Sequence, residues 1–551
     1  MIDFLIDRLE MMEPVQAIDP KGLSALLFLR EIDSGSNSEE QEVTVPSRHE
    51  ISWRSLLPAS ERTNSSLQGT LRTNLEKAIL EGHIPEGMRL PSTRAMASLL
   101  KVARITVSTV YDALEAQGLI LVRERSGHSV AKRSVGRQSL AKVVSSEPVK
   151  RPVWGLHLPA LPQGEKRLEK PRHWHKYKFP FVYGQVDQDL FPLPDWRECS
   201  RLAQAAPESG HWSSDAFDGD DRFLIEQLCG NVLPKRGITA SPDEVLITMG
   251  SQMGAYLLSE LLVQRGTTVA LEDPGYTEAR NLFLRREAHI LPMRVDQDGA
   301  IPPSELAAFS SIYLTPSHQC PTGATLSMER RMAFLQLARH HQSLIIEDDY
   351  DAQAHFGHLH PATLKAMDTS GHVIHLGSFS KVFAPGLRIG YMVADRELIA
   401  RARHLRRLII RHPPGNNQRA LALFLARGHY DRLLVRYREL LESRAHVLAD
   451  SVRRYLPTWK FKEPEGGSSL WLQAPAGTDM ATLKLQARKK GILIESGDSF
   501  FHEAMPQQQF ARLAYSTIDR NLIEPGIRLL AQVAWEQRNS NPQTETRLSS
   551  T

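Results

Sequence analysis

The sequence predicts a multidomain protein in which a small α+β unit is followed by a large α/β unit. In the small unit, helical patterns of apolar residues come before two strand-like runs on either side of Ser126 and Gly127. In the large unit, strand-like apolar runs alternate with helix-like segments, which is typical of parallel strands covered by helices on both faces. Five such runs lie at residues 245–248, 268–271, 311–314, 344–346 and 373–376.

Composition and targeting signals indicate an ordinary soluble protein. The chain has 551 residues, of which 41% are hydrophobic and 24% are charged. No run approaches the roughly 18 apolar residues that a membrane span requires, and the acidic start lacks the basic and apolar regions of a signal peptide. The three cysteines lack metal-ligand spacing. We therefore expect a cytoplasmic protein with no metal site and no membrane contact.

Changes in composition along the chain predict its boundaries. Residues 121–178 carry 14 Lys and Arg against 4 Asp and Glu. Such an excess suits either an extended, solvated linker or contact with a phosphate backbone. The expected order is a partly disordered extension over 1–62, the small unit over 63–133, a basic linker over 134–178, the large unit over 179–537 and a polar tail over 538–551.

The small unit is predicted to contain three helices. Apolar residues spaced by three or four from Leu67 to Ile79 indicate the first, which ends near Gly82. Ser92 is placed to cap the second, whose apolar stripe is Met96, Leu99 and Leu100. After a short turn at 101–103, the third helix turns four residues inward, namely Val107, Val110, Tyr111 and Leu114.

The outward face of the third helix carries short polar and basic side chains. A helix of this kind can enter the major groove of double-stranded DNA and bond to base edges and phosphates. The strand pair that follows forms a small hairpin, or wing. The alternative is a helical hairpin packed on a larger core with a solvated outer face. The residues expected at DNA are Arg94, Arg104, Thr106, Ser108, Thr109, Arg123 and Arg125.

Three stretches of this unit resemble the GntR-type winged helix-turn-helix. They are L-P-S-T-R at 90–94, the helix over 104–117 and the wing over 125–130. The resemblance implies a DNA-binding domain. One position departs from the family, which usually has a serine at the start of the recognition helix, where this chain has Ala103. That change removes an N-cap worth about 1 kcal/mol and one phosphate contact.

The large unit contains a lysine that follows a buried strand. Lys381 lies in G-S-F-S-K-V-F-A-P-G-L-R-I-G-Y, residues 377–391. Burying a lone ammonium group costs several kcal/mol. A Schiff base between the lysine amine and the aldehyde of pyridoxal 5′-phosphate (PLP) removes that cost. Each part of this cofactor also requires a protein group, so PLP binding can be checked against other motifs.

Residues at the ends of the predicted strands meet these requirements. A phosphate needs hydroxyl groups, a cation and N–H groups at a helix start, a protonated ring nitrogen needs a carboxylate, and the ring needs an aromatic face. Each residue taken alone also suits a cap, a turn or a packing role. The expected contacts are Ser251, Gln252, Ser378, Ser380 and Arg388 for phosphate, Asp348 for the ring nitrogen, Tyr350 for the ring hydroxyl and Tyr276 for the ring face.

The order of these motifs resembles that of the fold-type I aminotransferases. Joined to a GntR-type head, it is similar to the MocR/GabR family of PLP-binding regulators over residues 65–537. The resemblance implies that Lys381 forms the Schiff base, that Arg512 in A-R-L-A-Y binds a carboxylate of the effector, and that the protein is a head-to-tail homodimer. A surface salt bridge is the alternative role for Arg512.

Three positions depart from the related proteins. Cys320 occupies the place of an asparagine that binds the ring hydroxyl, and Phe217 that of a tyrosine lent to the neighbouring subunit. The GABA-responsive relative has an arginine after Pro-Gly-Tyr, whereas this chain reads Thr277-Glu278-Ala279. GABA is therefore not the expected effector.

These observations predict a transcriptional regulator that senses an amine or amino acid through a Schiff base, without physiological turnover. One alternative is an active aminotransferase with an accessory N-terminal unit. Another is a DNA-binding protein that holds no cofactor. The sequence leaves open the effector, the operator and the direction of regulation.

Overall fold

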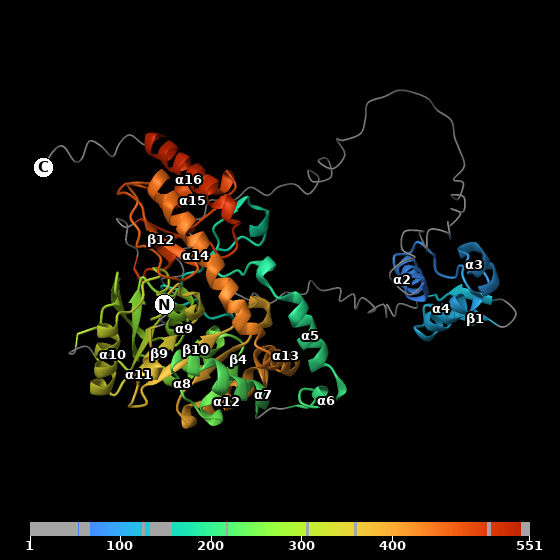
Figure 1. Ribbon diagram of the computed structural model, residues 1–551, viewed down its shortest axis with the longest axis horizontal. Coiled ribbons are helices and arrows are strands. Elements are labelled where there is room, and N and C mark those ends of the chain that lie inside the picture. The colour runs from blue at the N-terminus through green and yellow to red at the C-terminus, as the bar shows by residue number, and fades with distance from the viewer. Residues whose placement is uncertain are drawn as a thin grey trace, which may run out of the picture. The chain divides into compact units, whose positions relative to one another are not determined.

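The computed structural model describes Trp53 and residues 67–123, 127–132, 157–215, 219–304, 308–357, 361–503 and 509–540. The chain divides into two units, Met1–Pro152 and Val153–Thr551. Figure 1 shows the elements of both units. In the described part of the chain, no helix is long and apolar enough to cross a membrane. Arg125, Phe217, most of the N-terminal extension and the end of the polar tail lie outside the described residues.

The small unit has the predicted order of elements. It comprises helices α2 (Leu67–Leu80), α3 (Thr93–Leu100) and α4 (Arg104–Ala116) and strands β1 (Ile120–Arg123) and β2 (Gly127–Val130), which pair in an antiparallel hairpin. The four expected residues of α4 are buried in its core, together with Leu71 and Leu75. One expectation is wrong: Leu99 is 38% exposed, and Ala97 is buried in its place. The helical period puts Ala97 on the same face as Met96 and Leu100.

The ends of α3 and α4 are held as the sequence indicates. Ser92 Oγ accepts a hydrogen bond of 3.2 Å from the N–H of Ala95, and Ala103 makes no side-chain cap. The Tyr111 hydroxyl donates to the carbonyl of Pro91 at 2.9 Å. This bond ties α4 to the residues just before α3.

The large unit is built on an eight-stranded sheet, and all five predicted runs are strands in it. The strand at residues 390–393 was not predicted, and it runs antiparallel to both of its neighbours. The order across the sheet is β4 (Val245–Thr248), β11 (Gly390–Val393), β10 (Val373–Ser378), β9 (Leu344–Asp348), β8 (Ser311–Leu314), β5 (Thr268–Asp273), β6 (His289–Asp296) and β7 (Gly299–Ala300).

Helices cover both faces of this sheet, as the continuous apolar strands predict. Neighbouring residues of one strand enter different cores: Ile346 packs with α8 (Ser251–Leu262), α9 (Thr277–Arg285) and α12 (Arg396–Ile410). Ile345 packs with α10 (Met328–His341) and α11 (Leu364–Met367). A third cluster holds the other end of the sheet against α5 (Leu193–Ala203), α7 (Arg222–Gln227), α13 (Gly415–Ala426) and α14 (His429–Tyr455).

The C-terminal part of this unit forms a second, smaller sheet that the sequence analysis did not predict. Strands β12 (Ser469–Gln473), β15 (Phe510–Ala514) and β14 (Glu495–Ser496) pair in that order, and β13 (Ile492–Leu493) pairs with β3 (Phe179–Pro180). Helices α15 (Met480–Lys489) and α16 (Arg520–Ser540) lie beside it, and the long helix α14 runs from there to the large sheet (Figure 1). A short helix, α6, spans Ala206–Ser209.

Part of the expected linker packs on the large unit. The N–H of Lys166 donates to Asn281 Oδ1 at 3.2 Å, and Asn281 Nδ2 donates to the Lys166 carbonyl at 2.6 Å. Glu165 pairs at 2.9 Å with Arg285, which lies on α9, the helix that also carries Asn281. Glu165 and Lys166 therefore contact α9, although the pattern of this stretch in the sequence is that of a solvated linker.

Candidate functional site

Two glycines bring the turn after β4 and the start of β11 into close contact. Gly250, with φ of 86°, precedes α8, and a Cβ there would lie 3.1 Å from Nη2 of Arg388. A Cβ on Gly390 would lie 2.7 Å from the Cα of Gly250. Arg388 Nη2 donates to the carbonyl of Met249 at 2.6 Å. The guanidinium group of Arg388 therefore lies beside the N-terminus of α8, where helix N–H groups favour an anion.

The lysine segment follows β10 directly. Ser378 Oγ accepts a hydrogen bond of 3.2 Å from the N–H of Ser380, and the buried Ser380 hydroxyl has no hydrogen-bond partner within the described ranges. Lys381 Nζ lies 4.1 Å from the ring centroid of Tyr183 and 5.9 Å from that of Tyr350. Burial lowers the pKa of Lys381 to about 8, against the opposing effect of Asp351. Near neutral pH, a larger share of this amine is neutral than in an ordinary lysine.

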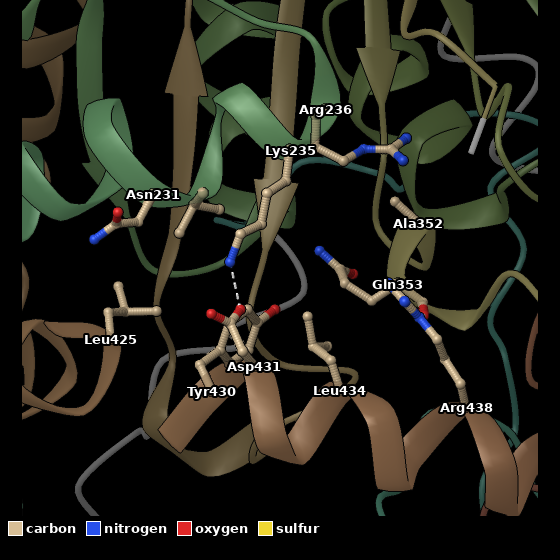
Figure 2. Close-up of a pocket in the computed structure, with 11 residues that line it drawn as sticks. Asn231, Lys235, Arg236, Ala352, Gln353, Leu425, Tyr430, Asp431, Leu434 and Arg438 are labelled. Atoms are coloured by element: carbon tan, nitrogen blue, oxygen red, sulfur yellow. Dashed lines mark hydrogen bonds and ion pairs between the residues drawn. The ribbon is translucent and has the colours of Figure 1, made fainter. Parts of the chain in front are cut away.

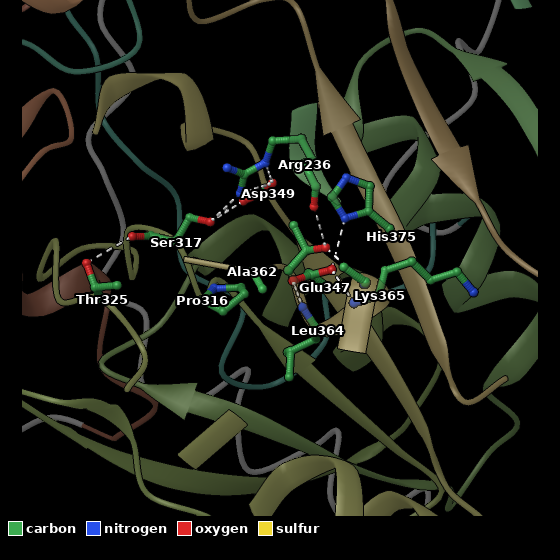
Figure 3. A network of polar contacts seen from close by, with 12 residues as sticks. Arg236, Pro316, Ser317, Thr325, Glu347, Asp349, Ala362, Leu364, Lys365 and His375 are labelled. Atoms are coloured by element: carbon green, nitrogen blue, oxygen red, sulfur yellow. Dashed lines mark hydrogen bonds and ion pairs between the residues drawn. The ribbon is translucent and has the colours of Figure 1, made fainter. Parts of the chain in front are cut away.

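The carboxylates on either side of Asp348 are used to hold the fold (Figure 3). Glu347 accepts a hydrogen bond of 2.7 Å from the N–H of Leu364 and bonds to His375 Nδ1 at 2.9 Å. Asp349 pairs with Arg236, whose Nη2 lies 2.8 Å from Oδ2. These acids are buried and paired, so neither is free to bind a cofactor.

Asp348 has an incomplete set of hydrogen bonds. The Tyr313 hydroxyl donates to its Oδ2 at 2.6 Å, whereas Oδ1 is buried and makes no hydrogen bond to any described residue. Burial raises the pKa of Asp348 to about 6, while the hydrogen bond from Tyr313 and, less strongly, the nearby Ser251 hydroxyl act to lower it. An N–H donor with a positive charge satisfies such an oxygen, and the protonated ring nitrogen of PLP is such a donor. The residues present therefore fit this cofactor.

Two tyrosines expected at the ring follow strands β5 and β9, which are separated in the sheet by β8. The Tyr276 hydroxyl donates to Gln252 Oε1 at 2.9 Å, which brings these two predicted contacts together. The Tyr350 hydroxyl donates to the carbonyl of His318 at 2.9 Å. In the described structure, that hydroxyl is therefore engaged with the backbone rather than directed to an open position.

Arg512 lies on β15 and is 3% exposed. Its Nε donates to Glu495 Oε2 at 2.7 Å, and its guanidinium carbon lies 3.9 Å from the ring centroid of Tyr183. Nη1 lies 3.7 Å from Cys320 Sγ. Arg512 thus forms a buried ion pair rather than a surface salt bridge, and it shares Tyr183 with Lys381.

Sequence reasoning missed four residues of this site. Tyr183 contacts both Lys381 and Arg512, and Asp351 raises the pKa of Lys381. The repeated acids of D-D-Y-D could have indicated Asp351, and the glycine after Tyr183 could have indicated a tight turn. The other two, Lys170 and Glu495, had no signal, because each lies far in the sequence from the motifs it joins.

A separate cavity is lined in part by Ala352 and Gln353, which follow directly after Asp351 (Figure 2). It is lined by Gln353, Tyr430 and Arg438 among others, and Lys235 Nζ lies 2.5 Å from Asp431 Oδ1 at its edge. The predicted PLP contacts do not line it. This cavity is therefore distinct from the site around Lys381.

The small unit displays the predicted polar face. Arg94, Arg104 and Thr109 are exposed, and Thr106 and Ser108 are partly buried. Arg104 Nε donates to Thr93 Oγ1 at 3.4 Å, which links α4 to α3. Arg123 ends β1. The sequence analysis overlooked Ile105, which is 72% exposed on α4. An exposed apolar side chain on a recognition helix suits contact with a thymine methyl group.

The fold and the site define a class of protein: a winged helix-turn-helix DNA-binding domain joined to a fold-type I, PLP-dependent domain. The sequence matches the gntR family of bacterial regulatory proteins over residues 67–130 and the aminotransferase class I and II family over residues 200–530. The sequence-based expectations of family, fold and cofactor are confirmed.

Similar proteins carry both units. The chain is 41% identical to the HTH-type transcriptional regulator TauR of Rhodobacter capsulatus, over 85% of this chain and 96% of that protein. It is 31% identical to the probable rhizopine catabolism regulatory protein MocR of Rhizobium meliloti, over 84% of this chain and 92% of that protein. The chain belongs to the MocR subfamily of HTH-type transcriptional regulators, whose large domain is of aminotransferase class I and II.

Solved structures support the fold of the large unit. The α-aminoadipate aminotransferase LysN of Thermus thermophilus, complexed with N-(5′-phosphopyridoxyl)-L-leucine, is 25% identical, with a TM-score of 0.62 over 70% of this chain and 100% of that chain. The kynurenine aminotransferase of Pyrococcus horikoshii is 24% identical, with a TM-score of 0.63 over 70% of this chain and 97% of that chain. The second likeness concerns the fold alone.

Proposed function

We propose that this DNA-binding regulator senses an amine or amino acid effector through PLP held at Lys381. The observation that carries the proposal is the carboxyl group of Asp348, which is buried and whose Oδ1 has no hydrogen-bond partner among the described residues. When bound, PLP supplies an aldehyde that condenses with primary amines. An effector with an amine can therefore compete with Lys381.

The residues of the chain have separate tasks in this proposal. Asp348 holds the ring N–H, and Tyr276 covers the face of the ring. Gln252 holds the Tyr276 side chain in place by accepting a hydrogen bond from its hydroxyl. Tyr350 stays the proposed partner of the ring hydroxyl. Phosphate is held by Ser251, Ser378, Ser380 and Arg388. Arg512 binds a carboxylate of the effector, and Glu495 orients its guanidinium group through the 2.7 Å ion pair.

Regulation requires that the effector bind two conformations of the protein with different affinity. We propose a head-to-tail homodimer, in which two winged units read two half-sites of an operator. Residues Arg94, Arg104, Thr106, Ser108, Thr109, Arg123 and Arg125 are the proposed DNA contacts. A DNA-binding role also agrees with the cytoplasmic location that the sequence predicts.

An active aminotransferase is the second candidate. It is favoured by the shared contact of Lys381 and Arg512 with Tyr183, because a transaminase needs an amine nucleophile and a carboxylate-binding arginine close together. Conversion of an amino donor to a keto acid over many turnovers, with no binding to DNA from upstream of the protein's own gene, would support this candidate against the regulator.

The test combines two measurements on the PLP-loaded protein. The visible absorbance is followed while a panel of amino acids and amines is added, and operator binding is followed by gel shift under the same conditions. We expect compounds of one chemical class to change both the visible absorbance and the binding to the operator. Lys381→Ala should lose the covalently bound chromophore and the effector response while keeping its circular dichroism spectrum. A persistent covalent adduct in this variant would place the anchor elsewhere, and a wild-type protein without visible absorbance would support the reading in which no cofactor binds.

A further inference from the structure

The segment at residues 165–170 is attached to the same part of the large unit that carries Arg512. Lys166 Nζ donates to the carbonyl of Phe501 at 2.8 Å and to that of Asp498 at 3.2 Å. Glu169 pairs with Lys484 at 3.1 Å. The ring of Phe500, next to these carbonyls, lies 4.6 Å from the guanidinium carbon of Arg512. The segment is thus held next to the proposed effector site by backbone and side-chain contacts.

Lys170 places a second amine close to that of Lys381. Its Nζ donates to the carbonyl of Tyr183. A Cβ built on Gly184 would lie 3.4 Å from Nζ of Lys170 and 3.2 Å from Nζ of Lys381, so both ammonium groups approach one point of the backbone. Lys170 is exposed to solvent along part of its side chain, so a ligand can approach it, while its amine points inward to the Tyr183 carbonyl.

The charged groups around these two amines do not balance. Lys381 interacts with Asp351, Arg512 and Lys170, and Lys170 interacts with Glu495 and Arg512. Among the described groups that act most strongly on these two amines, the cations are Lys170, Lys381 and Arg512, and the carboxylates are Asp351 and Glu495. Arg512 and Glu495 are already paired at 2.7 Å. Like charges gathered at one place repel each other, and an added anion relieves that repulsion.

We propose that Lys170 binds an acid group of the effector beside Arg512, while the effector's amine engages PLP. The effector is then a compound with both an amine and an oxyanion, not a simple amine. The inference rests on the proposed function and deepens it. Because residues 165–170 come between the winged unit and the rest of the large unit in the chain, the segment that follows the DNA-binding domain itself contacts the effector.

The experiment compares matched ligands on the PLP-loaded, full-length protein. L-alanine and β-alanine carry an amine and a carboxylate, and propylamine carries the amine alone. Affinities are taken from the change in visible absorbance. Lys170→Met removes the charge and keeps the length of the side chain, and Lys170→Arg keeps the charge. Lys176→Met is the control, because Lys176 is an exposed lysine near the same segment.

We expect the wild-type protein to bind at least one of the two amino acids more tightly than propylamine. Lys170→Met should weaken amino acid binding about 10- to 50-fold and change propylamine binding less than about twofold. Lys170→Arg should restore most of the affinity, and Lys176→Met should behave like the wild type.

Three results would overturn the inference: equal losses for amino acids and propylamine in Lys170→Met, no loss in that variant, or tighter binding of propylamine than of both amino acids by the wild type. A wild-type protein whose absorbance responds to none of the three compounds, nor to the wider panel above, would instead overturn the proposed function, and this inference with it.

Discussion

Asp348→Asn should stabilise the PLP-free protein. Burial raises the pKa of Asp348 from 3.8 to about 6, and a change of one in pKa corresponds to about 1.4 kcal/mol. Below pH 3.8 the carboxyl group is protonated in both the folded and the unfolded state, so its burial has no charge cost. As the pH rises from there through 6, the carboxyl group ionises first in the unfolded state. The free energy of unfolding therefore falls by about 3 kcal/mol.

Asparagine keeps an acceptor for the Tyr313 hydroxyl but carries no charge. The PLP-free variant should therefore be more stable than the wild type by up to about 3 kcal/mol at pH 8, with little difference at pH 4. The effect on PLP binding has the opposite sign. Loss of a buried, charge-assisted hydrogen bond to the ring nitrogen should cost about 2–4 kcal/mol, which is about 30- to 1000-fold in affinity for PLP.

Asp349→Asn is the matched control, because the neighbouring carboxylate has the opposite environment. Arg236 lies 2.8 Å away and lowers the pKa of Asp349. Removing one partner of a buried ion pair costs about 3–5 kcal/mol, so this variant should lose stability at pH 8. Urea unfolding of the PLP-free proteins between pH 4.5 and 8, with PLP binding followed by absorbance, measures both effects. An Asp348→Asn variant that is less stable than the wild type at pH 8, or that binds PLP equally well, would contradict these roles of Asp348.

Three further predictions concern other parts of the molecule. Gly377→Ala should lower the stability by at least about 3 kcal/mol in urea unfolding, because its Cβ would lie 2.1 Å from Cζ of the buried Tyr391; Gly386→Ala, which meets nothing within 4 Å, should leave it unchanged. The rate of PLP uptake by the PLP-free protein should rise with pH and level off near the pKa of Lys381, about 8; a rise that continues to pH 10 in stopped-flow absorbance would contradict the lowered pKa. Arg104→Ala should weaken operator binding and reduce the slope of log affinity against log salt by about 1, with unchanged visible absorbance, and an unaltered slope would reject a phosphate contact.

Local patterns in the sequence predicted much of the fold. The helices of the small unit follow from apolar periodicity and five strands of the large sheet from continuous apolar runs, and both patterns depend only on residues a few positions apart. The antiparallel strand β11 escaped prediction, because it is short and its first two residues end the motif that contains Lys381 and Arg388. The small sheet of β12, β14 and β15 was missed because its strands are short and widely separated in the chain.

The candidate site was likewise predicted only in part. In I-I-E-D-D-Y-D, the sequence pointed to Asp348, and the structure shows why its neighbours are unsuitable: Glu347 and Asp349 are occupied by His375 and Arg236. Those pairings join residues far apart in the sequence, so no local pattern reveals them.

The sequence by itself determined that a DNA-binding head precedes a PLP-dependent body, because order, spacing and periodicity are properties of neighbouring residues. Only the tertiary structure decided which charges meet: that Arg512 is already paired with Glu495, and that Lys170, from an apparent linker, lies beside Lys381. Electrostatic interactions depend on distance in space, and the packing of distant segments sets that distance.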